Sequence, residues 1–490
     1  MELIRPVFLW LVLDASLTRR ERLALTVKYS LPYYGVMAML VIWRAFFLEI
    51  PGGDPNALKL LELIRENPLL GFQHGLTVAV QDFVHLIFAA WADALKLELF
   101  DISDRFLLAS WGWGALIGIL IFFFLWRVKK TSVETDNTPF YRQAIPLGFL
   151  AILMALLPTW ATDNQISVGV FSSRFALPAL LGTCIFFVGG LDFLFHKTEQ
   201  KIIFLALCVS LATGVHLRSA NEFRWDWVKQ QRFFWQLAWR VPGLEDRTAL
   251  FSDGAIFQYV GGYSTSSALN ALYPLQVQYP EQSYWFVELD NTFWRDMDVF
   301  LNGAKVRGKL RNLSFSSTSQ DGIVIFYEPE MGSCLWVLSP EDGFLGDLPS
   351  LTAQAASVSN LTRIQTEQAY SNETFQTILG PEPEHTWCYY YQKAKLAEQI
   401  EDWQGIISLG EEAARLGYEP MSAYEWFPFV AANAHLENWR QAEELILKAY
   451  STSKKTRDRP AFCAFWNSLA PGEAAISVSS ELQCDLLPGD

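Results

Sequence analysis

Arginine and aspartate residues beside apolar segments are the residues of this chain best suited to chemistry. Arg44 lies about one and a half helical turns before the end of the apolar segment Thr26–Ile50. Arg174 opens another apolar segment. The acidic residues closest to these two in the predicted arrangement are Asp82, Asp101 and Asp104. Charge is expensive to bury in lipid, so such residues tend to have a partner or a function.

These residues support two interpretations. In the first, Arg44 and Arg174 hold the phosphate of a polyprenyl lipid through paired hydrogen bonds. Asp82, Asp101 or Asp104 is then catalytic, as a base or as a ligand of a divalent metal ion. In the second, the arginines reach lipid headgroups and the aspartates are simply solvated. The sequence predicts no other metal site or cofactor, because no zinc-ligand spacing occurs.

Five apolar segments predict a multi-pass membrane domain over residues 1–217, since a helix needs roughly 20 residues to cross a bilayer. The segments are Thr26–Ile50, Phe106–Trp126, Gln143–Ala161, Arg174–His196 and Lys201–His216. A further stretch, Gly75–Leu97, carries Asp82, His85 and Asp93. We therefore expect residues 75–97 to form an amphipathic helix at the outer interface of the membrane instead of a sixth span.

Basic residues predict the orientation of this domain, because Lys and Arg near span ends prefer the cytoplasmic side. They cluster at Arg19–Arg22 with Lys28, at Arg127–Lys130 with Arg142, and at Lys197 with Lys201. All three clusters share one side if residues 75–97 do not cross. We therefore expect residues 217–490 to be extracytoplasmic and the membrane to be the cytoplasmic membrane.

Charge separates the two parts of the chain. Residues 1–240 carry 22 basic and 19 acidic side chains, whereas residues 241–490 carry 16 and 33. The corresponding net charges are +3 and −17. A second part as acidic as this repels phosphate backbones, so we expect no nucleic-acid partner.

The water-facing part begins with an aromatic juxtamembrane helix over 218–242, which we expect Asn221 to cap and Pro242 to end. Its Trp and Phe residues suit packing under the next domain or a membrane-interface belt, and packing is favoured. Short runs with β-strand character predict a mixed α/β domain over 243–350. The runs are Thr248–Ser252, Tyr284–Leu289, Leu310–Phe315, Gly322–Tyr327 and Cys334–Leu338. Residues 351–384 have the composition of a linker, and 471–490 that of a flexible tail.

The last region, 385–470, contains a repeat. Trp403 and Trp439 are 36 residues apart, as are Ala413 and Ala449. Each Trp is predicted to begin the second helix of a pair. The pattern resembles the tetratricopeptide (TPR) repeat, in which large and small residues alternate so that paired helices stack. The resemblance implies contact with a protein partner, and the alternative is a helical cap on the α/β domain.

Four cysteines lie in the water-facing part, at Cys334, Cys388, Cys463 and Cys484. An extracytoplasmic location permits disulfides, but sequence alone does not assign the pairs.

The whole arrangement resembles the C-terminal part of GT-C-class glycosyltransferases, which are multi-pass membrane enzymes. Proteins of that class use polyprenyl-phosphate sugars at the outer membrane face and often carry an outward C-terminal domain. The segments WRAFF, GGDPN, WQLAWRVPGL, ALNALYP and GPEPEHTWCYYYQKAKLA also resemble bacterial multi-pass membrane proteins of no known activity. The class has its acidic motif in the first outward loop of the whole protein. We expect the chain to begin inside a longer membrane protein, in which case that loop is missing here and Asp101 and Asp104 match the motif only by residue type.

The predicted fold is an α-helical polytopic membrane domain followed by a soluble α/β domain and a TPR-like α-helical C-terminal region. The favoured function is a membrane-anchored scaffold that presents the last two regions to a protein partner. The alternative is a glycosyltransferase, or a degenerate relative, that uses a polyprenyl-phosphate-linked sugar.

Overall fold

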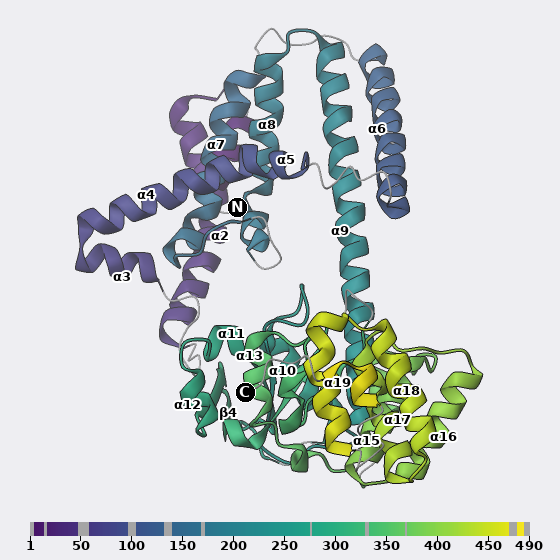
Figure 1. The fold of residues 1–490 in the computed structure, drawn as a ribbon. Coiled ribbons are helices and arrows are strands. Elements are labelled where there is room, and N and C mark those ends of the chain that lie inside the picture. Colours follow the sequence, from purple (N-terminus) through teal and green to yellow (C-terminus); the bar gives the residue numbers. More distant parts are fainter. Residues whose placement is uncertain are drawn as a thin grey trace. The chain divides into compact units, whose positions relative to one another are not determined.

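The computed structural model describes most of the chain. The described residues are 4–13, 17–47, 58–96, 104–131, 140–167, 172–274, 277–328, 333–367, 370–469 and 478–484. The chain divides into two compact units, Met1–Phe223 and Arg224–Asp490 (Figure 1). Asp101 lies outside the described residues.

The regular secondary structure in the described part of the first unit is all helical. Its helices are α1 (Arg5–Val12), α2 (Arg19–Phe46), α3 (Lys59–Glu66), α4 (Pro68–Val84), α5 (Ala90–Asp93), α6 (Arg105–Thr131), α7 (Tyr141–Ala161), α8 (Leu180–Leu194) and the start of α9 (Thr198–Arg240). A π-helical turn, η2 (His85–Ala89), joins α4 to α5, and a 3₁₀ turn, η4 (Ser173–Ala179), leads into α8. Six of the described helical segments are long and apolar enough to cross a membrane, which indicates a multi-pass membrane protein.

The sixth candidate span is the segment that the sequence assigned to the interface. The helical run begins at Pro68, seven residues before the expected start, and continues through η2 to Asp93. Asn67 caps it, because its side-chain oxygen accepts a hydrogen bond from the amide of Leu70 (3.2 Å). By length and composition the segment Pro68–Ala92 is a candidate span, and its position at the membrane interface stays a prediction.

Small residues allow the helices of the first unit to approach closely. A Cβ atom on Gly148 of α7 would lie 2.4 Å from the backbone nitrogen of Phe186 in α8. A Cβ atom on Gly114 of α6 would lie 2.7 Å from the carbonyl oxygen of Ser210 in α9, and one on Gly118 would lie 2.8 Å from the Cβ of Ser210. Such contacts are typical of helix pairs in membranes, where van der Waals packing replaces the hydrophobic effect as the cause of association.

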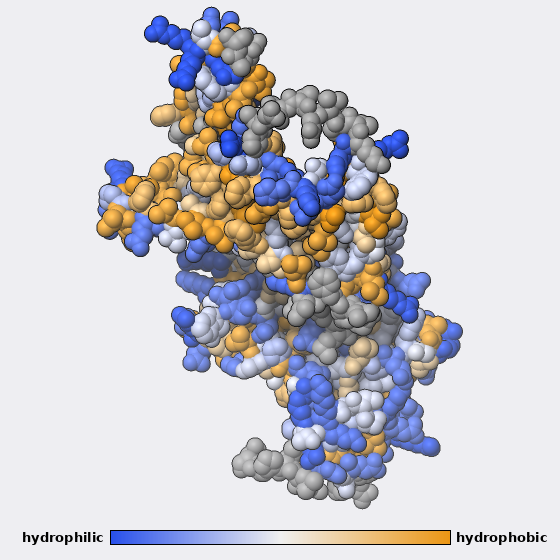
Figure 2. Space-filling view, turned by 90° about the horizontal axis from the view of Figure 1, so that it is seen from above, coloured by the Kyte–Doolittle hydropathy of each residue, from blue (hydrophilic) through white to orange (hydrophobic). Residues whose placement is uncertain are grey.

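Large apolar side chains are exposed along these helices. Met39 of α2 is 72% exposed and Phe123 of α6 is 63% exposed. Figure 2 shows broad apolar areas on the surface of the protein. Exposed apolar area of this extent is typical of contact with lipid.

Helix α9 is continuous through the region where the sequence predicted a break. Asn221 lies inside this helix, so the prediction that it caps a new one is wrong, whereas the helix does end just before Pro242. Phe233 and Trp235 are fully buried, which confirms the packing interpretation for this part of the helix. Trp225 and Trp227 remain more than 40% exposed.

A small sheet forms the centre of the second unit. The strands are β1 (Thr248–Ser252), β2 (Tyr284–Glu288), β3 (Lys305–Leu310), β4 (Leu313–Thr318), β5 (Gly322–Phe326) and β6 (Trp336–Val337). Four of them form a sheet in the order β2-β1-β5-β6, with β1 parallel to both neighbours and β6 antiparallel to β5. The sequence predicted one strand over Leu310–Phe315, but a turn at Arg311, whose φ is 56°, lies inside this range and joins β3 to β4 in a hairpin.

Helices cover both faces of this sheet. On one face, Leu250 and Ile323 are buried against the end of α9, α10 (Gly262–Leu272) and α14 (Asn372–Leu379). On the other face, Phe251 and Val324 belong to a core that includes α13 (Ser350–Ala356) and the C-terminal helices. Two short helices, α11 (Leu289–Thr292) and α12 (Met297–Leu301), precede the hairpin. Both faces are apolar because parallel strands of this kind are buried on both sides.

Residues 351–384 are not a linker. They contain most of α13 and all of α14, and Phe375 and Ala355 are fully buried. The predicted flexible tail is also packed in its described part, since Val478 and Leu482 belong to the core. Serine, threonine and glutamine dominate the composition of the predicted linker, but a few apolar side chains suffice to fix its helices.

The C-terminal region forms the two predicted helical pairs and one further helix. The first pair is α15 (Trp387–Gln399) with α16 (Trp403–Arg415), and the second is α17 (Phe427–His435) with α18 (Trp439–Thr452). A 3₁₀ turn, η9 (Ala423–Trp426), precedes α17, and α19 (Lys455–Leu469) follows α18. Trp403 and Trp439 therefore begin second helices, as predicted, and the pairs share a core with the sheet. A relationship to TPR repeats stays a prediction.

Two disulfides stabilise the second unit. Cys334 is bonded to Cys388, which links the segment just before β6 to α15, and Cys463 is bonded to Cys484. Cys184 and Cys208 of the first unit are free thiols.

Phe375→Ala tests whether residues 351–384 belong to the folded core. Because Phe375 is fully buried, the substitution should lower the free energy of unfolding by about 3–5 kcal/mol. The measurement is denaturant-induced unfolding of the full-length protein in detergent. Gln376→Ala, on the exposed side of the same helix, is the control and should change stability little. Equal stability of the two variants would restore the linker interpretation.

Candidate functional site

Asp82 of α4 is a buried structural carboxylate. It is fully buried, and its two oxygens accept hydrogen bonds from the indole nitrogen of Trp160 (2.8 Å) and the amide of Ile166 (2.9 Å). These bonds attach α4 to the C-terminal end of α7 and to the residues that follow it. The donors occupy the carboxylate oxygens, so the geometry favours a structural role over the predicted catalytic one.

A polar seam continues on both sides of Asp82. His74 Nε2 lies 2.7 Å from Asp163 Oδ1, and the side-chain nitrogen of Gln165 donates a hydrogen bond to the side-chain oxygen of Gln81 (2.6 Å). His74, Gln81 and Asp82 of α4 lie on one face of the helix, because Gln81 and Asp82 follow His74 by about two helical turns. The seam explains why an otherwise apolar helix carries these polar residues.

The other predicted site residues are exposed. Asp104 accepts a hydrogen bond from the amide of Phe106 (2.8 Å) at the start of α6, which is the position of a capping residue. Arg174 lies over the ring of Phe175, 5.3 Å from its centroid. Arg44 lies in the last turn of α2 with an exposed side chain. Among the described residues no ion pair joins Arg174 to Asp82 or Asp104.

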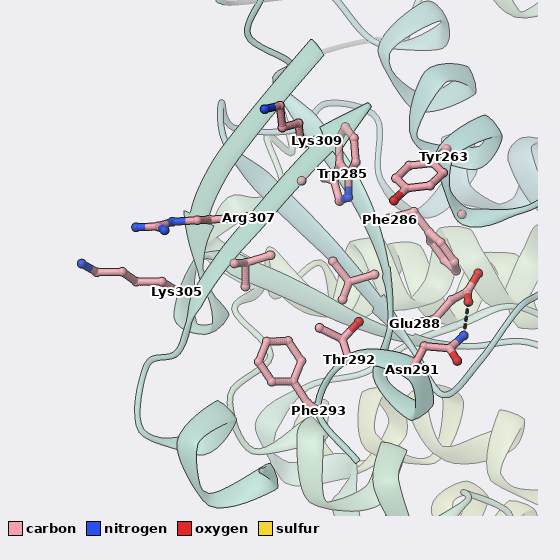
Figure 3. A pocket seen from close by; sticks show the side chains of 14 residues that line it. Tyr263, Trp285, Phe286, Glu288, Asn291, Thr292, Phe293, Lys305, Arg307 and Lys309 are labelled. Atoms are coloured by element: carbon pink, nitrogen blue, oxygen red, sulfur yellow. Dashed lines mark hydrogen bonds between the residues drawn. The ribbon is translucent and has the colours of Figure 1, made fainter. Parts of the chain in front are cut away.

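A hollow of about 630 Å³ lies between β2 and β3 of the second unit. Consecutive residues of both strands line it, together with the first residues of α10 and the segment after β2 (Figure 3). Its apolar wall centres on Trp285, whose ring stacks on Phe315 and makes an edge contact with Tyr263. In both pairs the ring centroids are 5.9 Å apart. We call this cavity the β2–β3 hollow.

The polar groups of the β2–β3 hollow differ in their partners: its acidic side is hydrogen-bonded, whereas the cations of its basic side form no ion pair among the described residues. Glu288 at the end of β2 accepts a hydrogen bond from Asn291 (2.5 Å), and both residues line the hollow (Figure 3). Lys305, Arg307 and Lys309 line its other side from β3 and are exposed. Lys305 and Arg307 extend away from Trp285 (Figure 3). In the described part of the chain these three cations have no ion-pair partner. This row was not predicted from the sequence, although basic residues at every second position are visible there.

A groove of about 800 Å³ runs between α16 and α18. Trp426, Phe429 and Trp439 provide aromatic walls, and Lys448 lies over the Trp426 ring at 4.7 Å. Gly410 permits close approach of α16 to α17, since a Cβ there would lie 2.8 Å from the ring of Phe429. We call this feature the α16–α18 groove.

Glu425 of η9 has a strongly displaced carboxyl pKa. Burial raises its pKa to about 7, because the cost of burying the charged form outweighs the hydrogen bonds, which lower the pKa. Its carboxylate accepts from the indoles of Trp387 (2.8 Å) and Trp336 (3.4 Å) and from the amides of Met421 and Cys334. A displaced pKa is a common sign of a catalytic group, but Glu425 is fully buried and lines neither cavity described above. It instead connects β6, α15 and η9 beside the disulfide at Cys334.

The described residues contain no group of three or more His, Cys, Asp or Glu side chains suited to a metal ion. No protein family, curated protein or solved structure matches the chain.

Asp82→Ala tests the structural role of the polar seam. Removing the carboxylate leaves the Trp160 indole and the Ile166 amide without an acceptor, and each buried donor costs about 1–3 kcal/mol. The thermal midpoint of the full-length protein in detergent should fall clearly. In a Trp160→Phe background, which already lacks one donor, the same substitution should cost less. Asp104→Ala is the exposed control, and a midpoint unchanged by Asp82→Ala would contradict the structural role.

Glu425→Gln should flatten the pH dependence of stability. The unfolded chain releases this proton near pH 4.5, whereas the folded state retains it up to about pH 7. The free energy of unfolding should therefore fall as pH rises through this window, by on the order of 3 kcal/mol. Below pH 4.5 the contribution is fully present. Denaturant unfolding between pH 4 and 8 measures the slope, and Glu419→Gln is the exposed control. A slope that survives Glu425→Gln would assign it to other groups.

Proposed function

We propose that the protein is a membrane-anchored scaffold whose second unit binds a protein partner in the α16–α18 groove. The groove itself carries this proposal. It combines a concave shape with two Trp residues and a Phe, and binding energy at protein interfaces concentrates on such aromatic residues.

The 36-residue repeat accounts for the position of the groove. Ile406 and Ala442, one repeat apart, are both fully buried, so α16 and α18 turn equivalent faces toward the core. Trp403 of the first pair stacks on His435 of the second, with ring centroids 4.0 Å apart. The repeat thus aligns the second helices of the pairs along one groove, as in repeat proteins that bind partners on a concave surface.

We also propose that the second unit is extracytoplasmic. The basic clusters near residues 127–142 and 197–201 fall on the same side if α7 and α8 both cross, and α9 then leads to the other side. This count does not depend on whether the segment Pro68–Ala92 crosses. The disulfides Cys334–Cys388 and Cys463–Cys484 support it, because disulfides persist in oxidising compartments.

The glycosyltransferase alternative has less support. It needs free carboxylates near phosphate-binding arginines, whereas Trp160 and Ile166 engage Asp82, and Asp104 caps α6. Binding of a polyprenyl phosphate at Arg44 and Arg174 stays a prediction.

A photo-crosslinking residue at Gln441 tests the scaffold function. Gln441 lines the groove, whereas Glu444, also exposed on α18, does not and is the matched position. In cells that produce the protein naturally, position 441 should capture a protein partner and position 444 should not.

A second substitution shows whether that capture depends on the groove. Ala414 is exposed on the groove wall, so Ala414→Arg should fill the groove without disturbing the core and should reduce capture by about tenfold or more. Glu412→Arg, on the same helix outside the groove, is the control. Equal capture at positions 441 and 444, or capture that survives Ala414→Arg, would contradict the proposal.

A further inference from the structure

One edge of β3 has unpaired backbone groups. Within the hairpin, Gly308 is opposite Phe315, and the amide of Ser319 donates to the carbonyl of Ala304 (2.8 Å). Antiparallel pairs alternate between hydrogen-bonded and non-hydrogen-bonded positions, so every second residue from Ala304 onward bonds to β4. The amides and carbonyls of Lys305, Arg307 and Lys309 therefore point to the opposite edge, along the β2–β3 hollow.

The strand across the hollow does not pair with this edge. The outer edge of β2 is occupied by side chains of α10. Asn270 accepts from the amide of Tyr284 (3.1 Å) and donates to its carbonyl (2.7 Å), and Ser266 accepts from the amide of Phe286 (2.9 Å). Helix α10 thus takes the place of a neighbouring strand for β2, whereas β3 has no such cover among the described residues.

The two faces of β3 have opposite chemistry. Lys305, Arg307 and Lys309 are exposed on one face, about 7 Å apart along the strand. On the other face Val306 is buried, and Gly308 lies directly on Trp285, where a Cβ would approach the ring to 2.1 Å. A strand added at this edge would place alternate side chains beside the cations and beside the apolar wall of the hollow.

We propose that the free edge of β3 binds an extended segment of a partner protein in which acidic and apolar residues alternate. Main-chain hydrogen bonds to the three basic residues supply affinity, and the alternating side chains supply specificity. The acidic residues face the cation row as cross-strand pairs, and the apolar residues enter the β2–β3 hollow beside Trp285.

Charge argues for this occupant over a second copy of the chain. Pairing of two β3 edges would bring two rows of cations together, and like charges on neighbouring strands are destabilising. The same cations attract an acidic segment. This site is distinct from the α16–α18 groove, so it goes beyond the scaffold function proposed above.

Binding of a short fluorescent peptide with alternating Glu and Val to the full-length protein in detergent tests the proposal. Fluorescence anisotropy should show saturable binding. Arg307→Glu should weaken it about tenfold or more, whereas Arg415→Glu, an equal charge change at an exposed position of α16 that lines neither the hollow nor the groove, should not. Ala414→Arg should also leave peptide binding unchanged, which separates this test from that of the groove.

Control peptides separate backbone pairing from simple charge attraction. A peptide of the same composition with its acids grouped together, and an alternating peptide N-methylated along one edge, should each bind about tenfold more weakly. Equal binding of these controls would reduce the site to an anion-binding surface, such as one for lipid headgroups, and would overturn the proposal. Absence of binding by the alternating peptide, or concentration-dependent dimerisation that Arg307→Glu strengthens, would overturn it as well.

Discussion

Burial of both faces of the four-stranded sheet is the constraint on which the second unit depends. Leu250 and Ile323 face one side and Phe251 and Val324 the other, and all four are almost inaccessible to solvent. Strands of this kind need helices on both sides, because neither face can be left in water. The last turns of α9 cover one face with α10 and α14. The other face requires α13 and the helical pairs, which explains why these pairs belong to the same core and do not form a separate module.

The parts of the fold that local patterns determine could be predicted from the sequence. Strands β1 and β5 were found within a residue of their bounds, since short apolar runs between turn residues indicate buried strands. The hairpin was missed because its turn at Arg311 lacks the Gly or Asn that usually permits a positive φ at that position. The helices of 351–384 were missed for a different reason. Their stability comes from tertiary burial of residues such as Phe375, and composition alone does not reveal it.

The candidate site was harder to predict, because the role of a charged residue depends on its partners. An acid in an apolar segment, such as Asp82, can be recognised from the sequence. Its structural role cannot, because its hydrogen-bond partners Trp160 and Ile166 are about 80 residues away in the sequence. Glu425 was passed over, since nothing in the sequence shows that two indoles and two amides surround it. The cation row of β3 is visible in the sequence, but the free strand edge beneath it depends on the register of the hairpin and on α10.

The two proposed binding surfaces are preformed because they belong to one connected core. The disulfide between Cys334 and Cys388 and the hydrogen bonds of Glu425 attach α15 to β6, and the helical pairs extend from α15. The hairpin is fixed to the same core through Phe315 and Trp285. Both surfaces are therefore already ordered when the protein has folded. Binding of a partner does not have to offset the entropy cost of ordering them. The remaining cost of binding falls on the partner, and it is smallest for a segment that is already helical or extended.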